Sequence, residues 1–271
     1  MERKNDKIAK YLSTYVVAKH ESALIADPER IFPYFPIGRR HNIPEDRFLD
    51  WVKAADYETA APHWWSQYSK MLYKKIFEHY ASIELVNMSP GGTYLEAASC
   101  ASPFYRVIRD THDVAMCYRQ DLTHIAGVRG DTIGSDAGAI PLPDAGLDGI
   151  VTHNSWEHFE GDSAIGFIRE CARLLKPGRK FCIIPLIFRE QTEIWTSPSC
   201  WLTKYVNAPD FPIFDRRAAI VIKEEIVQRQ IMWWKPAELA NELSKISELE
   251  FEVVYVECGQ LNMYSLVGAR R

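Results

Sequence analysis

The sequence predicts an α/β protein built on a mostly parallel sheet. From residue 93 onward, short apolar runs of strand length alternate with stretches of helical periodicity, which is typical of parallel strands joined by helices. Residues 147–151 (Leu-Asp-Gly-Ile-Val) are one such run. Polar residues follow it directly, as expected of a buried strand that delivers side chains to a site at its carboxyl end. The runs at 251–257 and 263–269 are separated by a Gly-Gln-Leu-Asn turn and predict a closing hairpin.

Five further strands precede this hairpin. We expect them at residues 93–97, 114–118, 132–135, 147–152 and 180–186. A helix is expected between the last two, at about residues 163–175, with Asp162 as its N-cap and Lys176-Pro-Gly178 as its stop. A second helix should begin at Pro236 and run to about residue 246.

The first ninety residues contain little glycine and predict helical segments joined by irregular linkers. A proline-rich stretch at residues 28–44 rules out a long helix there. Residues 62–80 predict one amphipathic helix of about five turns, because apolar side chains recur every four residues from Trp64 to Tyr80. This helix either only packs on the sheet or also places Trp64 and Trp65 in an acceptor pocket.

Composition indicates a soluble protein of the cytoplasm. The chain has 271 residues, 47% of them apolar, and a net charge of −4, so no general positive field would hold a nucleic acid. No run approaches the roughly 18 apolar residues of a membrane span, and the charged N-terminus does not read as a signal peptide. The six cysteines form neither a Cys-x-x-Cys pair nor a Cys/His cluster, so we expect reduced thiols and no metal site.

Two phrases of the sequence resemble a known family. Residues 136–159 contain an acid and a small residue, then Ile-Pro-Leu-Pro-Asp, Leu-Asp-Gly-Ile-Val and Glu-His-Phe, and residues 173–178 read Arg-Leu-Leu-Lys-Pro-Gly. Both resemble the class I S-adenosylmethionine-dependent methyltransferases of the type-11 kind, over roughly residues 91–186. The resemblance implies a Rossmann-like, seven-stranded, mostly parallel sheet with an antiparallel last strand. It also implies S-adenosylmethionine as cofactor and S-adenosylhomocysteine as product.

We expect residues 1–271 to form a single methyltransferase-like domain. Residues 1–90 would be a helical cap, residues 91–187 and 236–271 the Rossmann-like core, and residues 188–235 an insertion over the cleft. The tryptophans of this cover suit a sugar or a planar ring. Packing of the insertion on the core, or a homodimer contact, explains them equally well. The tryptophans are Trp64, Trp65, Trp195, Trp201, Trp233 and Trp234.

The resemblance implies that the turn after the first strand approaches the methionine part of the cofactor. Glu96 supplies the acid that precedes this turn in the family. The family's glycines are replaced by small residues, here Ala97, Ala98 and Ser99, followed by Cys100 and Ala101. Close approach to a ligand should survive these replacements, but any position that needs a positive φ should be lost.

Other cofactor contacts are implied at the ends of the next strands. Asp121, or Tyr118 at the expected strand tip, would bind the ribose hydroxyls, although a solvated loop aspartate is the alternative for Asp121. Asp136 and Ala137 would meet the adenine, unless Asp136 only caps its loop. After the fourth strand, the cofactor and acceptor should face a segment that includes Asn154 and Trp156.

His153 and His158 are the candidates for a general base. Because the family uses Glu-His-Phe with many acceptors, His158 is alternatively a structural or cofactor-shell residue. We expect methyl transfer to a small molecule or sugar, with oxygen favoured because His153 is available and no Asn-Pro-Pro-Tyr motif occurs. The glycine-poor turn leaves a second hypothesis, a non-catalytic scaffold or partner subunit in a larger biosynthetic assembly. A protein or RNA methyltransferase is disfavoured by the acidic net charge.

Overall fold

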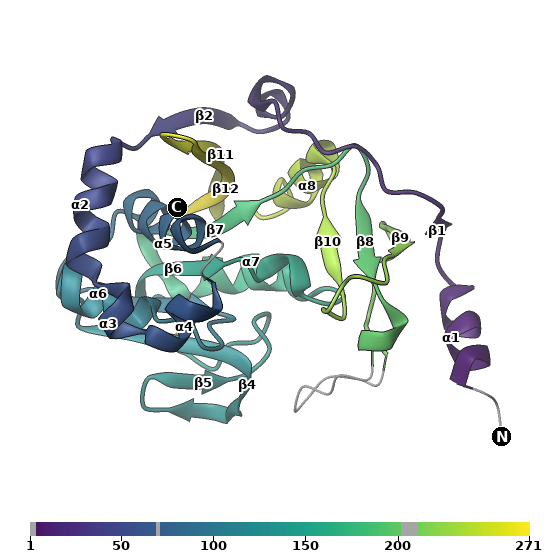
Figure 1. The fold of residues 1–271 in the computed structure, drawn as a ribbon, viewed down its shortest axis with the longest axis horizontal. Coiled ribbons are helices and arrows are strands. Elements are labelled where there is room, and N and C mark those ends of the chain that lie inside the picture. The colour runs from purple at the N-terminus through teal and green to yellow at the C-terminus, as the bar shows by residue number, and fades with distance from the viewer. Residues whose placement is uncertain (1–3, 69–70, 202–210) are drawn as a thin grey trace.

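A computed structural model describes residues 4–68, 71–201 and 211–271 of the chain. Its centre is an eight-stranded sheet in the order β2-β11-β12-β7-β6-β3-β4-β5 (Figure 1). The sheet contains β2 (Ile37–Asn42), β3 (Thr93–Ala97), β4 (Met116–Arg129), β5 (Thr132–Gly134), β6 (Leu147–His153), β7 (Leu175–Leu186), β11 (Leu249–Cys258) and β12 (Leu261–Arg270). Strands β4, β3, β6 and β7 pair in parallel, whereas β12 is antiparallel to both of its neighbours. The Rossmann-like fold class is therefore confirmed.

The strand order reverses between β3 and β6. From β3 the chain moves outward through β4 and β5, and it then crosses back to β6 on the other side of β3. In open α/β sheets, ligands bind outside the carboxyl ends of the strands at such a switch point. Glu96 and His153 lie at the carboxyl ends of β3 and β6, so this edge is the place to look for a site.

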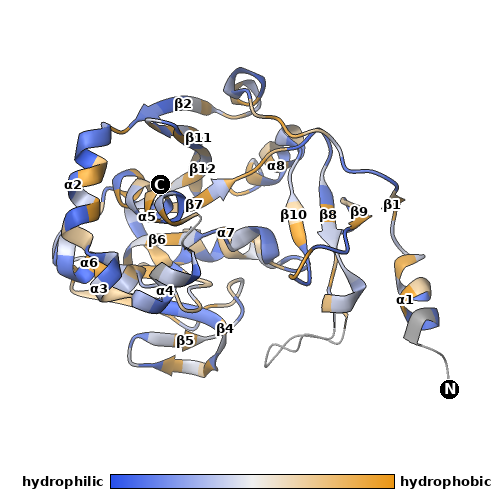
Figure 2. Cartoon of the chain, viewed as in Figure 1, coloured by the Kyte–Doolittle hydropathy of each residue, from blue (hydrophilic) through white to orange (hydrophobic). Residues whose placement is uncertain are grey.

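Helices cover both faces of the sheet, and each face has its own apolar core. Tyr94 and Val151 belong to one core together with residues of α2, α5 and α6, whereas their neighbours Leu95 and Ile150 belong to the other with residues of α7 and α8. This alternation follows from the two-residue period of a strand. Figure 2 shows the strand β6 largely orange. The helices are α1 (Lys4–Leu12), α2 (Glu45–Ala55), α3 (Tyr57–Ala60), α4 (Pro62–Gln67), α5 (Leu72–Val86), α6 (Phe104–His112), α7 (Ser163–Leu174) and α8 (Pro236–Leu243).

The prediction of one long helix at residues 62–80 is wrong. The structure has α4 and α5 instead, and residues 69–70 between them lie outside the described residues. In one continuous helix, Trp64 and His79 would be about 22 Å apart along the axis. Here their rings stack with centroids 5.4 Å apart. Burial of Trp64 against His79 and Tyr57 therefore outweighs the local helical pattern.

The eighth strand comes from a stretch that the sequence did not predict as a strand. β2 lies between Pro36 and Pro44 and pairs in parallel with β11 at the edge of the sheet. None of its residues is buried, so it lacks the apolar signal of the central strands. Arg39 donates two hydrogen bonds to Glu252 of β11, at 2.7 and 3.2 Å, and this pairing across the strands aligns them.

The other expected elements are present with shifted ends. The first strand is confirmed at Thr93–Ala97, and α7 and the closing hairpin lie where they were expected. β4 continues far beyond Tyr118, and after a register shift its second half pairs again with the residues of β5. Asp162 occupies the N-cap position of α7, but its side chain makes no capping hydrogen bond.

The stretch at residues 188–235 contributes to a second, four-stranded sheet that also uses the start of the chain. Its order is β1-β9-β8-β10, and β1 pairs in parallel with β9. In Figure 1 this sheet and α1 lie to one side of the main sheet, with β10 on the side toward α7 and α1 farthest from it. Residues 202–210 of this stretch lie outside the described residues. Its strands are β1 (Val17–Ala18), β8 (Glu193–Thr196), β9 (Ala219–Ile222) and β10 (Ile231–Trp233). Among the described helices, none has the length and apolar character of a membrane span.

Candidate functional site

The turn after β3 keeps a shape that glycine would normally supply. Ala98 has φ +51° and Cys100 has φ +42°, both in the left-handed region. The expectation that positive φ is lost with the glycines is therefore wrong. A residue with a Cβ atom costs about 1 kcal/mol or more in this region. The surrounding hydrogen bonds must hold the turn against this strain.

Those hydrogen bonds are accepted by Gln120 and Asp121 of β4. Three successive backbone N–H groups of the turn donate to it: Ala98 N to Gln120 Oε1 at 3.1 Å, Ser99 N to Gln120 O at 2.9 Å, and Cys100 N to Asp121 Oδ2 at 2.9 Å. Asp121 Oδ1 also accepts hydrogen bonds from the N–H and hydroxyl of Thr123. Asp121 is therefore a buried anchor of the turn, and its carboxylate lies beside the glycine-poor segment.

The end of β5 joins the same edge through Gln120. The Gln120 side chain donates from Nε2 to the carbonyl of Ser135 at 2.5 Å. The next residue, Asp136, accepts a hydrogen bond from Gly138 N at 2.7 Å and one from the Ser163 hydroxyl at 3.0 Å. Asp136 is exposed and caps its loop, whereas Ala137 is buried.

Tyr118 is not at a strand tip. It pairs with Leu95 in the middle of the β3–β4 ladder, and its ring packs against the core on the face that carries α7. The expected tip was three residues too early, because β4 continues through Asp121. Of the two ribose candidates, only Asp121 lies at the turn.

Glu96 and His153 form a buried pair at the switch point. The Glu96 side chain is 1% exposed and that of His153 is 5% exposed, and Glu96 Oε1 lies 3.0 Å from His153 Nδ1. Glu96 Oε1 also accepts a hydrogen bond from the Ser102 hydroxyl at 2.6 Å. The other ring nitrogen of His153, Nε2, lies 2.9 Å from the hydroxyl of Ser82 on α5. Both nitrogens of His153 are thus engaged inside the protein.

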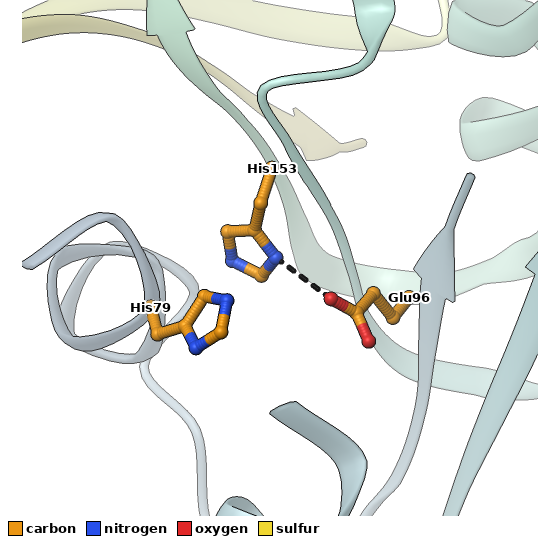
Figure 3. A group of neighbouring side chains, drawn as sticks. All are labelled: His79, Glu96 and His153. Carbon is orange, nitrogen blue, oxygen red and sulfur yellow. Dashed lines mark hydrogen bonds and ion pairs between the residues drawn. The ribbon is translucent and has the colours of Figure 1, made fainter. Parts of the chain in front are cut away.

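A second histidine, His79 of α5, faces this pair (Figure 3). Its ring centroid is 4.6 Å from that of His153, and its Nδ1 lies 2.7 Å from the hydroxyl of Tyr57. Desolvation by burial, together with the charges of His153 and Lys75, lowers the pKa of His79 well below its ordinary value. His79 is therefore neutral near pH 7, beside a buried carboxylate.

The residues that follow β6 lie in three different environments. Asn154 is exposed and has φ +48°. Trp156 is buried, donates from Nε1 to the carbonyl of Ala164 at 2.9 Å, and stacks on Trp234. His158 donates from Nδ1 to the carbonyl of Gln230 at 2.8 Å, which leaves Nε2 as its basic nitrogen. The His158 side chain is 26% exposed, and the nearest carboxylate, that of Glu157, lies 3.9 Å from Nε2.

The described tryptophans serve mainly in packing. Trp64, Trp201 and Trp234 are buried in the two cores. Trp195 and Trp233 are half-buried and pack edge to face, with Arg189 and Lys223 over the Trp195 ring. The side chain of Trp65 lies outside what the structure describes. For the three buried rings, packing on the core is the explanation that the geometry supports.

A comparison with protein-family models finds a match to the segment that forms this edge of the sheet. The family model described as a methyltransferase domain, of type 11, matches residues 92–183, which reach from β3 into β7 and contain Glu96, Asp121 and Asp136. This segment is therefore a methyltransferase domain, as the resemblance implied. No protein with a curated description matches the sequence.

Solved methyltransferase structures resemble the chain at low identity. A chain from the complex of the Haloferax volcanii Trm112 methyltransferase activator with a methyltransferase is 13% identical, with 79% of this chain and 97% of that chain covered and a TM-score of 0.49. The 1,6-didemethyltoxoflavin-N1-methyltransferase of Burkholderia thailandensis is 15% identical, with 94% of each chain covered and a TM-score of 0.45. An S-adenosylmethionine-dependent methyltransferase of Aquifex aeolicus is 15% identical, with 72% and 90% covered and a TM-score of 0.41. These likenesses are too distant to indicate what this chain methylates.

Several residues of the site could not be found from the sequence. Gln120 connects the ends of β3, β4 and β5, yet it is one polar residue in a strand. His79 and Tyr57 lie in helices that looked like simple core packing. The small residues at positions 97–101 offer one signal, because they replace the family's glycines and the next residue, Ser102, bonds the acid of the turn.

Proposed function

We propose that this methyltransferase transfers the methyl group of S-adenosylmethionine to a hydroxyl oxygen of a small molecule or sugar in the cytoplasm. The observation that carries the proposal is the shared edge of β3, β4 and β5, where Glu96, Asp121 and Asp136 lie around one turn of preserved shape. Methyl transfer needs mainly alignment, because the sulfonium of the cofactor already activates the methyl group.

The residues of the turn fit this cofactor. A ligand can approach the backbone closely only where side chains are small and the chain turns sharply. Residues 97–101 are Ala, Ala, Ser, Cys and Ala, and two of them keep the positive φ that a glycine would supply. We propose that Glu96, Ala97, Ala98 and Ser99 hold the methionine part, that Asp121 binds the ribose, and that Asp136 with Ala137 meets the adenine. Asn154 would face the sulfonium, whereas Trp156 supports that segment from the core.

We propose distinct roles for the two histidines. His153 has both ring nitrogens bonded and is buried, so its geometry favours positioning of Glu96 over proton transfer. His158 Nε2 makes no hydrogen bond within the described part of the chain, although Glu157 Oε1 lies 3.9 Å away, and the ring is partly exposed. In the proposed reaction the acceptor oxygen forms a bond to the methyl carbon while the S–CH₃ bond breaks. The hydroxyl proton passes to His158 Nε2, and the sulfur retains the bonding electrons in S-adenosylhomocysteine.

A cavity next to the segment that follows His158 supports a small acceptor. Its volume is about 370 Å³, and it lies between the start of α7 and residues 213–217. Cavities of small-molecule ligands are typically about 300–1,000 Å³. Gly161 and Phe214 line it together with Arg169 and Arg216. We propose the second sheet, which contacts residues 157–161 through Gln230 and Arg229, as the cover of this acceptor site.

Thermal unfolding with and without cofactor tests the proposal. At about 100 times its dissociation constant, S-adenosylmethionine or S-adenosylhomocysteine should stabilise the protein by about 2.7 kcal/mol, which raises Tm by about 5 °C. Asp136→Ala should lose most of this shift, because it removes the proposed partner of the adenine.

Ser163→Ala is the matched control, since it removes the hydroxyl that bonds Asp136 and leaves the carboxylate in place. This variant should keep the shift. If neither ligand changes the Tm of the natural chain, the proposal is wrong and the scaffold hypothesis gains, because the glycine-poor turn then blocks the cofactor.

The role of His158 is tested by kinetics on an acceptor found in a hydroxyl-compound screen. His158→Gln should lower kcat by about 10²–10⁴-fold and flatten the fall of the rate at acidic pH, because it removes the base. The cofactor-induced rise in Tm should be unchanged in this variant. An unchanged kcat, or an equal loss of cofactor binding, would assign His158 to structure.

A further inference from the structure

Three potential metal ligands meet beneath the turn, from three separate elements. His79 belongs to α5, Glu96 ends β3 and His153 ends β6. One ligand atom of each residue lies within 4.8 Å of the ligand atoms of the other two. Figure 3 shows both imidazole rings and the carboxylate converging on one point. His79 is only 2% exposed, so all three side chains are removed from solvent.

One atom of this cluster lacks the partner that burial requires. Glu96 Oε2 is buried and accepts no hydrogen bond from the described residues. An unpaired carboxylate oxygen in such a place costs several kcal/mol unless a cation or a donor compensates it. No hydrogen bond is recorded for His79 Nε2 among the described residues, although the opposite nitrogen bonds Tyr57. A cation between these atoms would satisfy both of them.

We propose that His79, Glu96 and His153 bind one divalent transition-metal ion of the zinc type. Two imidazoles and one carboxylate are a donor set that zinc uses with a fourth, open position. In a tetrahedral zinc site the ligand atoms lie about 3.4 Å apart. The widest separation in the cluster therefore has to shorten by about 1.4 Å, which small side-chain rotations can supply. No sequence motif indicated this site, because its ligands are 17 and 57 residues apart.

The surroundings of the cluster suit a metal ion. A histidine that binds a metal usually donates its other N–H to a nearby oxygen, and the Tyr57 hydroxyl is placed to accept from His79 Nδ1. The Ser82 hydroxyl is likewise placed to accept from His153 Nε2, on the side of the ring away from Glu96. A water molecule would occupy the fourth position.

Metal binding is measured on chelator-treated, tag-free protein that carries Cys100→Ser and Cys200→Ser. Those two cysteines are the ones that are not buried, so their removal excludes binding by accessible thiols. Titration calorimetry with Zn²⁺ should give one ion per chain, and Co²⁺ should produce the visible absorption of a low-coordinate complex. His79→Gln should weaken Zn²⁺ binding by at least about 100-fold. Tyr57→Phe should weaken it by about 10–100-fold, because it removes the oxygen that orients His79.

His112→Gln is the matched control, since His112 is a partly buried histidine on α6 whose ring bonds Thr111. It should bind Zn²⁺ as the parent does. Fewer than about 0.2 ions per chain, or equal effects of His79→Gln and His112→Gln, would overturn the proposal. If His79→Gln does not fold, Tyr57→Phe decides in its place. The cofactor test is run in chelator and this one without cofactor, so either proposal can fail alone.

Discussion

At the scale of the residue, helix α5 carries a buried ion pair. Glu78 is 1% exposed and pairs with Lys75 at 3.0 Å. Desolvation by burial outweighs the attraction of Lys75 and raises the pKa of Glu78 to about 7, from an ordinary value of 4.5. The folded protein therefore holds this proton more tightly than the unfolded chain does. Ionisation of Glu78 opposes folding.

The sign of the pH dependence follows from this shift. Between pH 5 and 8 the unfolded chain has lost the proton that the folded state keeps, so stability falls as pH rises through the folded pKa. Relative to Glu78→Gln, the natural chain should lose about 2 kcal/mol of unfolding free energy across this range. Denaturant unfolding of both proteins at pH 5, 6, 7 and 8 checks this. Parallel curves would show that Lys75 compensates Glu78 fully.

At the scale of the element, the turn after β3 is held in shape from outside. Ala98 and Cys100 have positive φ values, which are typical of glycine. Gln120 and Asp121 of β4 accept the hydrogen bonds that hold the turn in this conformation. The sequence shows which residues replace the glycines. It does not show the backbone angles, because those depend on Gln120 and Asp121 across the ladder.

Restoring glycine to the turn should therefore relieve strain. We expect Ala98→Gly and Cys100→Gly each to raise the unfolding free energy by about 1 kcal/mol. Ala97→Gly is the control, because Ala97 is the last residue of β3 and is absent from the positive-φ positions. That change should lower stability by about 0.5–1 kcal/mol. Chemical denaturation measures all three, and destabilisation by both turn variants would contradict the strain argument.

Elements with a strong local hydrophobic pattern were predicted well from the sequence, and elements without one were missed. β3, β6, α7 and the closing hairpin are long, periodic or strongly apolar, and they were found. The edge strand β2 and the break between α4 and α5 were missed. Both depend on distant partners, Glu252 for β2 and the stacked rings of His79 and Tyr57 for the break.

At the scale of the whole molecule, each of the two sheets combines strands from segments that are far apart in the sequence. The stretch at residues 188–235 pairs with Val17–Ala18 near the start of the chain, and Ile220 N donates to the carbonyl of Val16. The description of residues 1–90 as one helical cap therefore leaves out β1 and β2, which join different sheets. Such pairings between remote segments carry no local signal that a sequence could display.

Local periodicity and short phrases in which neighbouring residues act together were enough to predict the fold class and the places of the core strands along the chain. They did not show that Tyr118 lies inside its strand, that His153 is buried against Glu96 or that His79 joins this pair. The physical reason is that burial and hydrogen bonding depend on which distant elements meet. No periodicity within one segment records those meetings.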